Sequence, residues 1–318
     1  GGGGILEVPC GRGKCLGIDT PILMYDGTVK AVQDVEVGDV LMGDDSTPRN
    51  VLSLARGREP MYRVCSKKHD GYVVNQSHIL SLKHVSTGKV NDICVTDYLE
   101  NPDQIEDWLG YRVKVDFQEL SSVPTNEDAY QFAIQSNPLQ TTHIPHLYKT
   151  GSSESRSHYM MGLLNSISVS LVTEYQISTF HASFAEDIVF VARSLGMVAY
   201  WTQQYKYCDV RISTDAETKD TQTYEITLEP LGEDDYYGFE IDGNRRFVLG
   251  DFTVTHNTIM SLNIIHRMCK KTIILVHKEF LMNQWIDRIR DFLPSARVGI
   301  IQGTKHDIEN KDIVIAMI

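Results

Sequence analysis

With 318 residues and 42% hydrophobic content, the chain is long enough for about two globular domains. It has no run of 18 or more apolar residues and begins with a glycine tract that lacks the features of a signal peptide, so we expect a cytoplasmic monomer with no membrane partner. The net charge is −12, and because the two flanks are basic the stretch from Cys15 to Asn257 carries −16, which argues against a DNA-binding middle segment.

The first motif is VPCGRGK, from Val8 to Lys14, which has the glycines and the lysine of a phosphate-binding loop. Backbone amides of such a loop surround the phosphates, the lysine meets the β- and γ-oxygens, and a following Ser or Thr binds Mg²⁺. Here Cys15 follows Lys14, and a thiol is a poor ligand for that hard cation. The loop therefore lacks a hydroxyl at one position.

The predicted secondary structure changes along the chain. From Cys15 to about Leu120, short β segments alternate with Gly/Asp turns, as in TPILMYDGTVKAVQDV and MYRVCSKKHDGYVVNQSHILSLKHV. From about Asp116 to Glu225, helical patterns occur in SRSHYMMGLLNSISVSL and SFAEDIVFVARSLGMVAYW. A further β piece, TYEITLEPLGEDDYYGFEIDGNRRFVLGDFTVTHN, closes this segment. The six cysteines include no CxxC pair, so we expect no metal site.

The residues after Asn257 have an α/β pattern. TIMSLNIIHRMCKK predicts a helix, TIILVH a strand and KEFLMNQWIDRIRDFL an amphipathic helix. If Cys15 to Asn257 is removed, Thr258 follows Lys14 directly and supplies the missing hydroxyl. The repaired loop then runs into a helix, which is the context that a phosphate-binding loop requires.

Two segments at these junctions carry a family resemblance. CLGIDTPILMYDGTVKAVQDVEVGDVLMG resembles the N-terminal splicing block of inteins, and FVLGDFTVTHN with the following Thr resembles their C-terminal block. The resemblance implies a mainly β Hint-type fold that excises itself and joins its flanks, the exteins, which are its partners. It divides the chain into an N-extein, an N-terminal splicing half, an α+β insert, a C-terminal splicing half and a C-extein, at residues 1–14, 15–120, 121–225, 226–257 and 258–318.

The rejoined flanks resemble the P-loop region of a superfamily-two DNA helicase. TIILVHKEFLMNQWIDRIRDFLP is similar to the helicase motif that follows the loop. The resemblance implies ATP and Mg²⁺ as cofactors and DNA as a partner, but only for the spliced host. The expected ATP-binding residues are Gly11, Gly13, Lys14 and Thr258.

The first step of splicing needs a nucleophile at the first junction. A thiol is partly ionised near neutral pH, so we expect Cys15 to attack the Lys14 carbonyl and form a thioester. The departing nitrogen needs a proton donor, and NQSH offers His78. This block usually reads TxxH in inteins, whereas Asn75 stands in the Thr position here, where its amide could donate to an oxyanion.

The remaining steps take place at the second junction and need no cofactor. The Thr258 hydroxyl takes the acyl group from Cys15, the Asn257 side chain cyclises and cuts the bond to Thr258, and His256 is the expected proton donor. Arg246 and Asp251 lie where this block often carries a catalytic His or polar helper, and the sequence assigns neither.

The insert is similar to a LAGLIDADG homing endonuclease, particularly in HIPHLYKTGSSESRSHYMMGLLNSISVS. The metal-binding acidic residue that ends the motif helix in that family is replaced by Ile167, and Asn165 stands where another Asp is common. The first motif copy, expected around Pro124 to Pro138, is not recognisable. We therefore expect a degenerate remnant without nuclease activity, because an isoleucine cannot hold Mg²⁺.

Two other functions remain open as alternatives. A site-specific homing endonuclease would need two acidic motif ends and a basic groove. An ATP-dependent DNA helicase would need an acidic motif for Mg²⁺, and none appears before Ile318. Taken singly, Cys15, His78 and His256 also fit ordinary structural roles, and it is the repaired loop that favours splicing.

Overall fold

The computed structural model describes residues 15–66, 71–101, 105–117, 125–171, 174–213, 222–256, 270–276, 279–293 and 295–317. The chain divides into two compact units, one of Cys10–Thr258 and the other of Gly1–Pro9 with Ile259–Ile318. The finer division into exteins, splicing halves and insert stays a prediction. Within the described ranges, no helix combines the length and the apolar character needed to cross a bilayer.

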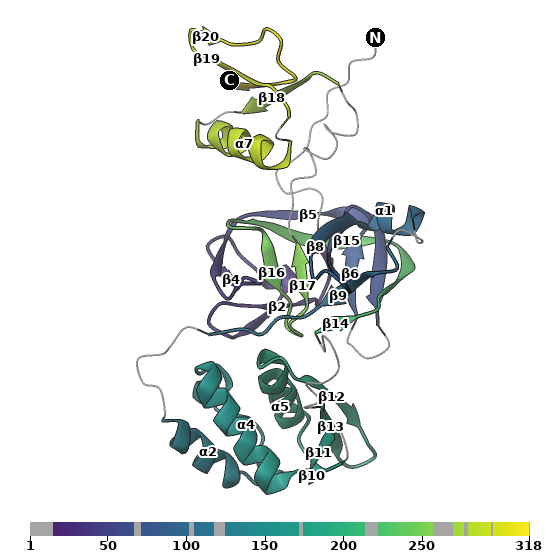
Figure 1. The fold of residues 1–318 in the computed structure, drawn as a ribbon, viewed down its shortest axis with the longest axis vertical. Helices are drawn as coiled ribbons and strands as arrows, with labels where there is room; N and C mark the ends of the chain where they lie inside the picture. Colours follow the sequence, from purple (N-terminus) through teal and green to yellow (C-terminus); the bar gives the residue numbers. More distant parts are fainter. Residues whose placement is uncertain are drawn as a thin grey trace. The chain divides into compact units, whose positions relative to one another are not determined.

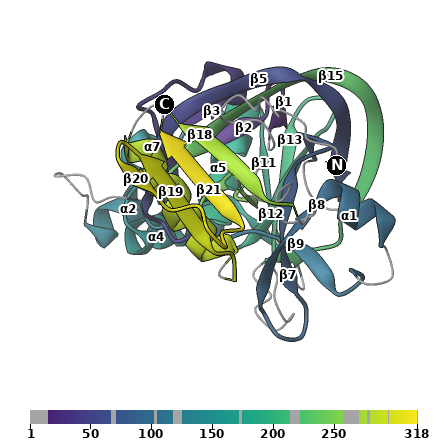
Figure 2. The same ribbon diagram turned by 90° about the horizontal axis from the view of Figure 1, so that it is seen from above.

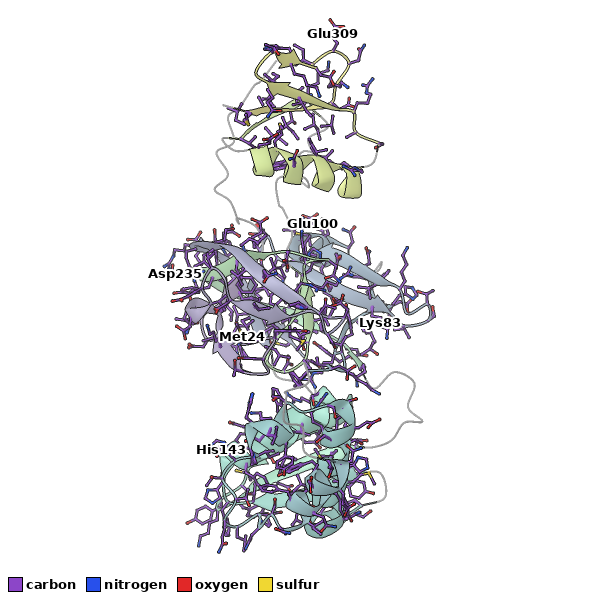
Figure 3. All side chains as sticks on the ribbon, turned by 90° about the vertical axis from the view of Figure 1, so that its left-hand side faces the viewer. Met24, Lys83, Glu100, His143, Asp235 and Glu309 are labelled. Carbon is purple, nitrogen blue, oxygen red and sulfur yellow. The ribbon has the colours of Figure 1, made fainter. Side chains whose placement is uncertain are left out.

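The larger unit contains a long antiparallel ribbon of β5 (Pro48–Cys65) and β15 (Thr227–Ile241). Figure 2 shows these strands side by side along their length. Together with three short strands they form a sheet in the order β15-β1-β6-β5-β4. The short strands are β1 (Leu16–Gly17), β4 (Val40–Met42) and β6 (Tyr72–Asn75). Asp235 lies at the outer edge of this ribbon (Figure 3) and forms an exposed ion pair with Arg58.

A second sheet in this unit has the order β14-β9-β7-β8. Its strands are β7 (Ile79–His84), β8 (Val90–Cys94), β9 (Trp108–Tyr111) and β14 (Thr223–Tyr224). Two hairpins and two short helices complete this β part: β2 (Pro21–Leu23) with β3 (Val29–Ala31), β16 (Arg246–Val248) with β17 (Val254–His256), η1 (Val32–Asp34) and α1 (Val95–Glu100). The β pattern predicted for both ends of this segment is confirmed in the described residues.

The core of the β part joins strands from both ends of the segment. Buried aliphatic and aromatic side chains from β1, β6, β7, β15 and β16 form one cluster, which includes Leu16, Val74, Leu80, Phe239 and Phe247. β17 lies beside β7, so the last strand of the segment packs within the same fold as the first. The packing of sequence-distant strands therefore brings the two ends of the segment into one fold.

The middle of the larger unit combines helices with a four-stranded antiparallel sheet of order β10-β11-β13-β12 (Figure 1). The helices are α2 (Asn126–Ile134), α3 (His146–Lys149), α4 (Ser153–Ile167) and α5 (Ala182–Ser194). The strands are β10 (Val169–Ser170), β11 (Glu174–Thr179), β12 (Val198–Gln203) and β13 (Cys208–Ser213). The two predicted helical patterns are confirmed as α4 and α5, and α2 is a helix that the sequence pattern did not reveal.

Helices α2 and α4 pack closely because α4 carries a glycine at the contact. A Cβ atom built on Gly162 would lie 2.7 Å from the Cβ of Ala133, which is closer than two non-bonded carbon atoms approach. Thr125 begins α2 with a capping box, in which its side chain and that of Asp128 each accept the other's backbone N–H. The capping box and the close contact with α4 explain why α2 forms, although its sequence shows no clear helical repeat of apolar residues.

The helical middle packs directly on the β part. Phe190 of α5 and Phe252 of the β16–β17 turn meet edge to face, with ring centroids 5.0 Å apart. Both belong to one buried cluster with Leu23 of β2, Met42 of β4 and Val248 of β16, and with Val115 and Phe117 from the segment that follows β9. The helical middle therefore packs against the hairpin that ends at His256.

The smaller unit is an α/β sheet of order β18-β21-β19-β20. Strands β18 (Thr272–Val276), β21 (Ile313–Met317) and β19 (Val298–Gln302) are parallel, and β20 (Lys305–His306) pairs antiparallel with β19. Helix α7 (Glu279–Phe292) packs against the sheet through Met282 and Ile289. The strand and the second helix predicted after Asn257 are confirmed, while the first predicted helix lies outside the described residues.

Candidate active site

Cys15 lies directly before β1 and is fully buried. Its side chain belongs to a small apolar cluster with Ala55, Met61 and Tyr236, against which Val73 packs. Its backbone is held on both sides by Asn75. The Cys15 N–H donates to the Asn75 side-chain oxygen at 2.9 Å, and the Asn75 N–H donates to the Cys15 carbonyl oxygen at 3.1 Å.

The nitrogen in that first hydrogen bond belongs to the peptide bond between Lys14 and Cys15. Lys14 itself, together with Gly11, Gly13, Asn257 and Thr258, lies outside the described residues. The predicted roles of these five residues in splicing and ATP binding therefore stay predictions. The structure describes one atom of the bond that the sequence predicts to break first, and Asn75 contacts that atom.

Asn75 ends β6 and is fully buried. Its side-chain NH₂ donates to Glu59 Oε2 at 2.8 Å, and Glu59 Oε2 also accepts the Ser77 hydroxyl at 3.1 Å. The sequence suggested that the Asn75 amide could donate to an oxyanion. The structure instead directs its oxygen to the Cys15 nitrogen and its NH₂ group to Glu59.

His78 follows in the same turn, where its backbone N–H donates to the Asn75 carbonyl oxygen at 2.9 Å. Its side chain is 1% exposed, and its Nε2 lies 2.7 Å from the Thr255 hydroxyl. Thr255 is fully buried on β17 and immediately precedes His256. The turn Asn75–His78 thus contacts the first residue of the segment at one end and its last strand at the other.

His256 ends β17 with a side chain that is almost fully buried. Its Nε2 lies 3.7 Å from Asp92 Oδ2. Asp92, on β8, also accepts the Ser81 hydroxyl at 2.7 Å and pairs with Arg246 at 2.7 Å. Burial acts to raise the pKa of Asp92, but the charge of His256, the Ser81 hydrogen bond and Arg246 together hold it below its usual value.

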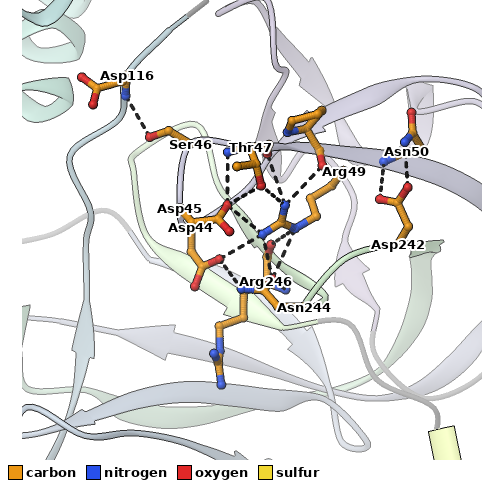
Figure 4. A network of polar contacts seen from close by, with 11 residues as sticks. Asp44, Asp45, Ser46, Thr47, Arg49, Asn50, Asp116, Asp242, Asn244 and Arg246 are labelled. Atoms are coloured by element: carbon orange, nitrogen blue, oxygen red, sulfur yellow. Dashed lines mark hydrogen bonds and ion pairs between the residues drawn. The ribbon is translucent and has the colours of Figure 1, made fainter. Parts of the chain in front are cut away.

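Arg246 owes its position to a buried arginine at the adjoining turns (Figure 4). The guanidinium of Arg49 is 3% exposed, and its Nε lies 3.2 Å from both the Asn244 side-chain oxygen and the Arg246 carbonyl oxygen. It also pairs with Asp45 at 2.8 Å and with Asp44 at 3.3 Å. These contacts join the β4–β5 turn to the start of β16, from which Arg246 reaches Asp92.

Asp251 lies apart from this group, in the β16–β17 turn. It pairs with Arg112 at 2.8 Å and accepts the backbone N–H of Thr253 at 3.0 Å. Burial acts to raise the pKa of Asp251, and the charge and hydrogen bond of Arg112 outweigh that effect and lower it. These contacts stabilise the turn of the β16–β17 hairpin.

Three residues of this site carried no sequence signal: Glu59, Asp92 and Thr255. Glu59 and Asp92 lie in strands outside the two junction motifs. Thr255 lies within the second motif, but threonine is common in strands and so gives no indication of a role. Their roles come from pairing between distant segments, which the linear order of residues does not reveal.

Comparison with known proteins finds a matching family model, Hom_end-associated Hint, over residues 15–256. Among solved structures, the gp41-1 intein is 11% identical, covers 77% of this chain and 100% of its own, and gives a TM-score of 0.36. A DnaB intein from Synechocystis sp. PCC 6803 is 8% identical, covers 77% of this chain and 99% of its own, and gives a TM-score of 0.32. These TM-scores are too low to support an argument about function.

Among curated proteins, the catalytic subunit of a V-type proton ATPase from Candida tropicalis is 44% identical over 50 residues. The match covers 16% of this chain and 5% of that protein, so it says little about the whole of either. The family model, by contrast, matches most of the chain and spans both junction motifs up to His256. The chain therefore belongs to the Hom_end-associated Hint family.

Proposed function

We propose that the chain is an intein that removes residues 15–257 and joins Lys14 to Thr258. The Hint family supports protein splicing in general. The observation that carries the residue-level proposal is the Asn75–His78 turn, which hydrogen-bonds to Cys15 at one end and to Thr255, beside His256, at the other.

In the first step, Cys15 Sγ adds to the Lys14 carbonyl carbon and the bond from that carbon to the Cys15 nitrogen breaks. The thiol proton is transferred, in net terms, to the released nitrogen, and a thioester remains. Asn75 contacts that nitrogen, and His78, one turn away, is the proposed proton donor. No metal or cofactor enters this step.

In the second step, the Thr258 hydroxyl oxygen displaces Cys15 Sγ, so the thioester becomes an ester and the thiol is restored. The Asn257 side-chain nitrogen then attacks its own backbone carbonyl carbon, and the bond to the Thr258 nitrogen breaks as a succinimide forms. His256, held near Asp92, is the proposed donor to that nitrogen. The freed Thr258 amine finally captures the ester, which gives the Lys14-to-Thr258 peptide bond.

An Asn257→Ala variant separates these steps. It should stop cleavage before Thr258 and still form the thioester, so an added thiol should release an N-terminal fragment that ends at Lys14. Adding Cys15→Ala should abolish that release. If Asn257→Ala released no fragment while remaining folded, Cys15 could not be the first nucleophile.

We also propose that splicing rebuilds the phosphate-binding loop of a helicase. The parallel order of β18, β21 and β19, with α7 against the sheet, supports an α/β host. Gly11, Gly13, Lys14 and Thr258 would then hold ATP with Mg²⁺ in the full-length host, which would act on DNA. The unspliced chain should not bind ATP, and equilibrium binding of a fluorescent ATP analogue to both forms tests this.

The insert is proposed to be a degenerate endonuclease remnant that does not cleave DNA. Helix α4 ends at Ile167, and the amide of Asn165 donates to the Tyr130 hydroxyl at 3.3 Å, so no carboxylate ends this helix. In the described strands of the insert sheet, Arg211 is the basic residue, and it is paired with Asp209 and Glu174. Such a sheet offers little charge to phosphates. Cleavage of extein-coding DNA with Mg²⁺ would contradict this assignment.

A further inference from the structure

The carboxylate of Glu59 lies one hydrogen bond away from the group that contacts the scissile nitrogen. Glu59 belongs to β5, and its Oε2 accepts from Asn75 Nδ2 at 2.8 Å and from Ser77 Oγ at 3.1 Å. The opposite end of the same amide, Asn75 Oδ1, accepts the Cys15 N–H at 2.9 Å. Glu59, Asn75 and the Cys15 nitrogen therefore form a continuous chain of hydrogen bonds.

The chemistry of the two neighbours allows one orientation of the Asn75 amide. A carboxylate can only accept, and a backbone N–H can only donate. If the amide turned over, its NH₂ group would face the Cys15 N–H and its oxygen would face the Glu59 carboxylate. Both contacts would then be repulsive, inside a site where Asn75 is fully buried.

A hydrogen-bond acceptor at the Cys15 nitrogen favours thioester formation. Thioester formation turns a planar amide nitrogen into an amine, which gains a proton and positive charge as the bond breaks. A hydrogen bond strengthens when its donor becomes charged. The Asn75 oxygen therefore stabilises the departing nitrogen more than it stabilises the starting peptide bond, which is the requirement for catalysis.

We propose that Glu59 is a positioning residue for the first step, which fixes the Asn75 amide with its oxygen on the Lys14–Cys15 nitrogen. The proposal rests on the splicing function proposed above. Glu59 itself touches no reacting atom and acts through Asn75. Asn75 in turn is a catalytic residue, because it contacts the nitrogen that leaves.

The test uses the full chain with Asn257→Ala, so that thiol-induced release of the N-terminal fragment reports the first step alone. Glu59→Ala should slow that release by about ten- to a hundredfold, the range for losing a hydrogen bond to a charged group. Glu59→Lys should slow it at least as much, because an ammonium donates to the amide oxygen and favours the wrong orientation. Glu233→Ala is the matched control, since it removes an exposed carboxylate from the paired strand.

A second background separates orientation from general stability. In Asn75→Thr, a hydroxyl can rotate to accept the Cys15 N–H whatever its other neighbours are, so Glu59 has no amide left to orient. In that background, Glu59→Ala should change the rate by less than about twofold, and the two substitutions should therefore couple strongly in a double-mutant cycle. Glu59→Gln provides the same comparison if Glu59→Ala does not fold, with a smaller expected loss.

The outcomes distinguish this inference from the function on which it rests. If the parent Asn257→Ala chain releases no fragment, the proposed splicing chemistry is wrong. If the parent releases it and Glu59→Ala slows both backgrounds equally, Glu59 acts by supporting the strand, and the positioning role is overturned. A full-rate Glu59→Ala in the parent background would overturn it as well.

Discussion

His78 Nε2 and the Thr255 hydroxyl lie 2.7 Å apart, although 177 residues separate them in the chain. Thr255 precedes His256 on β17, and His78 shares a turn with Asn75, whose side chain holds the Cys15 nitrogen. One hydrogen bond thus links the surroundings of the first junction to the strand that leads to the second. If the chain splices as proposed, a change at this contact should affect both junctions.

Replacing Thr255 by Val should disturb both junctions, because the shape is kept while the hydroxyl is lost. The imidazole of His78 then loses a buried partner, which costs about 1 to 3 kcal/mol and corresponds to a slowing of roughly fivefold to 150-fold. Thiol-induced release of the N-terminal fragment measures this effect. Thr255→Ser keeps the hydroxyl and should splice near the parent rate, and equal losses in Val and Ser would point to packing instead.

Asp92→Asn should slow the second junction and spare the first. Removing this carboxylate takes away the negative charge beside His256 and so disfavours its imidazolium form. In a Cys15→Ala background, where only cleavage before Thr258 remains, the rate should fall and its pH profile should move toward lower pH. Glu100→Gln, at the end of α1 (Figure 3), is the control for losing a carboxylate elsewhere. An unchanged pH profile in Asp92→Asn would separate Asp92 from His256.

Acid should destabilise the larger unit through Asp251. Its folded pKa is lowered, so its ion pair with Arg112 contributes stability that is present above the unfolded pKa of about 4 and is lost as pH falls toward the folded value. Denaturant unfolding of a non-splicing Cys15→Ala, Asn257→Ala chain between pH 7 and pH 3 measures this. Asp251→Asn should cost about 3 kcal/mol at pH 7, because it leaves Arg112 without its carboxylate, and should flatten the pH dependence.

Phe190→Ala tests whether the insert supports the splicing fold. Phe190 is 7% exposed and packs against Phe252, which is fully buried, so truncation should lower the free energy of unfolding by about 3 kcal/mol. It should also slow cleavage before Thr258, because Phe252 lies in the turn that leads into β17. Phe132→Ala removes a ring that stacks on Tyr148 within the helical part, with centroids 4.6 Å apart, so it should leave the rate of cleavage unchanged whatever it costs in stability. Equal slowing of cleavage by the two variants would contradict a specific role for the Phe190–Phe252 contact.

The sequence predicts those parts of the site that are local in the chain. Cys15, His78 and His256 lie in short motifs, and the broken phosphate-binding loop marks both junctions. The residues that contact them cannot be predicted in this way. Glu59 lies 16 residues from Asn75, and Arg246 lies 154 residues from Asp92, and both contacts depend on strand pairing that no local pattern encodes.

The same limit applies to the fold. Strand alternation and helical periods predict β segments and helices such as α4 and α5, because each buries one face. Helix α2 is not predicted from the sequence, because its apolar face is narrow and its position depends on Gly162 of α4. The orientation of the Asn75 amide cannot be predicted either, since it depends on the Cys15 N–H as donor and the Glu59 carboxylate as acceptor.

The most direct test of splicing is the intact mass of the expressed 318-residue chain, beside a Cys15→Ala, Asn257→Ala double variant. Splicing predicts a 75-residue product that joins Lys14 to Thr258, together with a free 243-residue species that ends in a succinimide at Asn257. The double variant should remain whole. A 36.0 kDa chain that stays uncleaved under reducing conditions in both samples would contradict splicing by this chain.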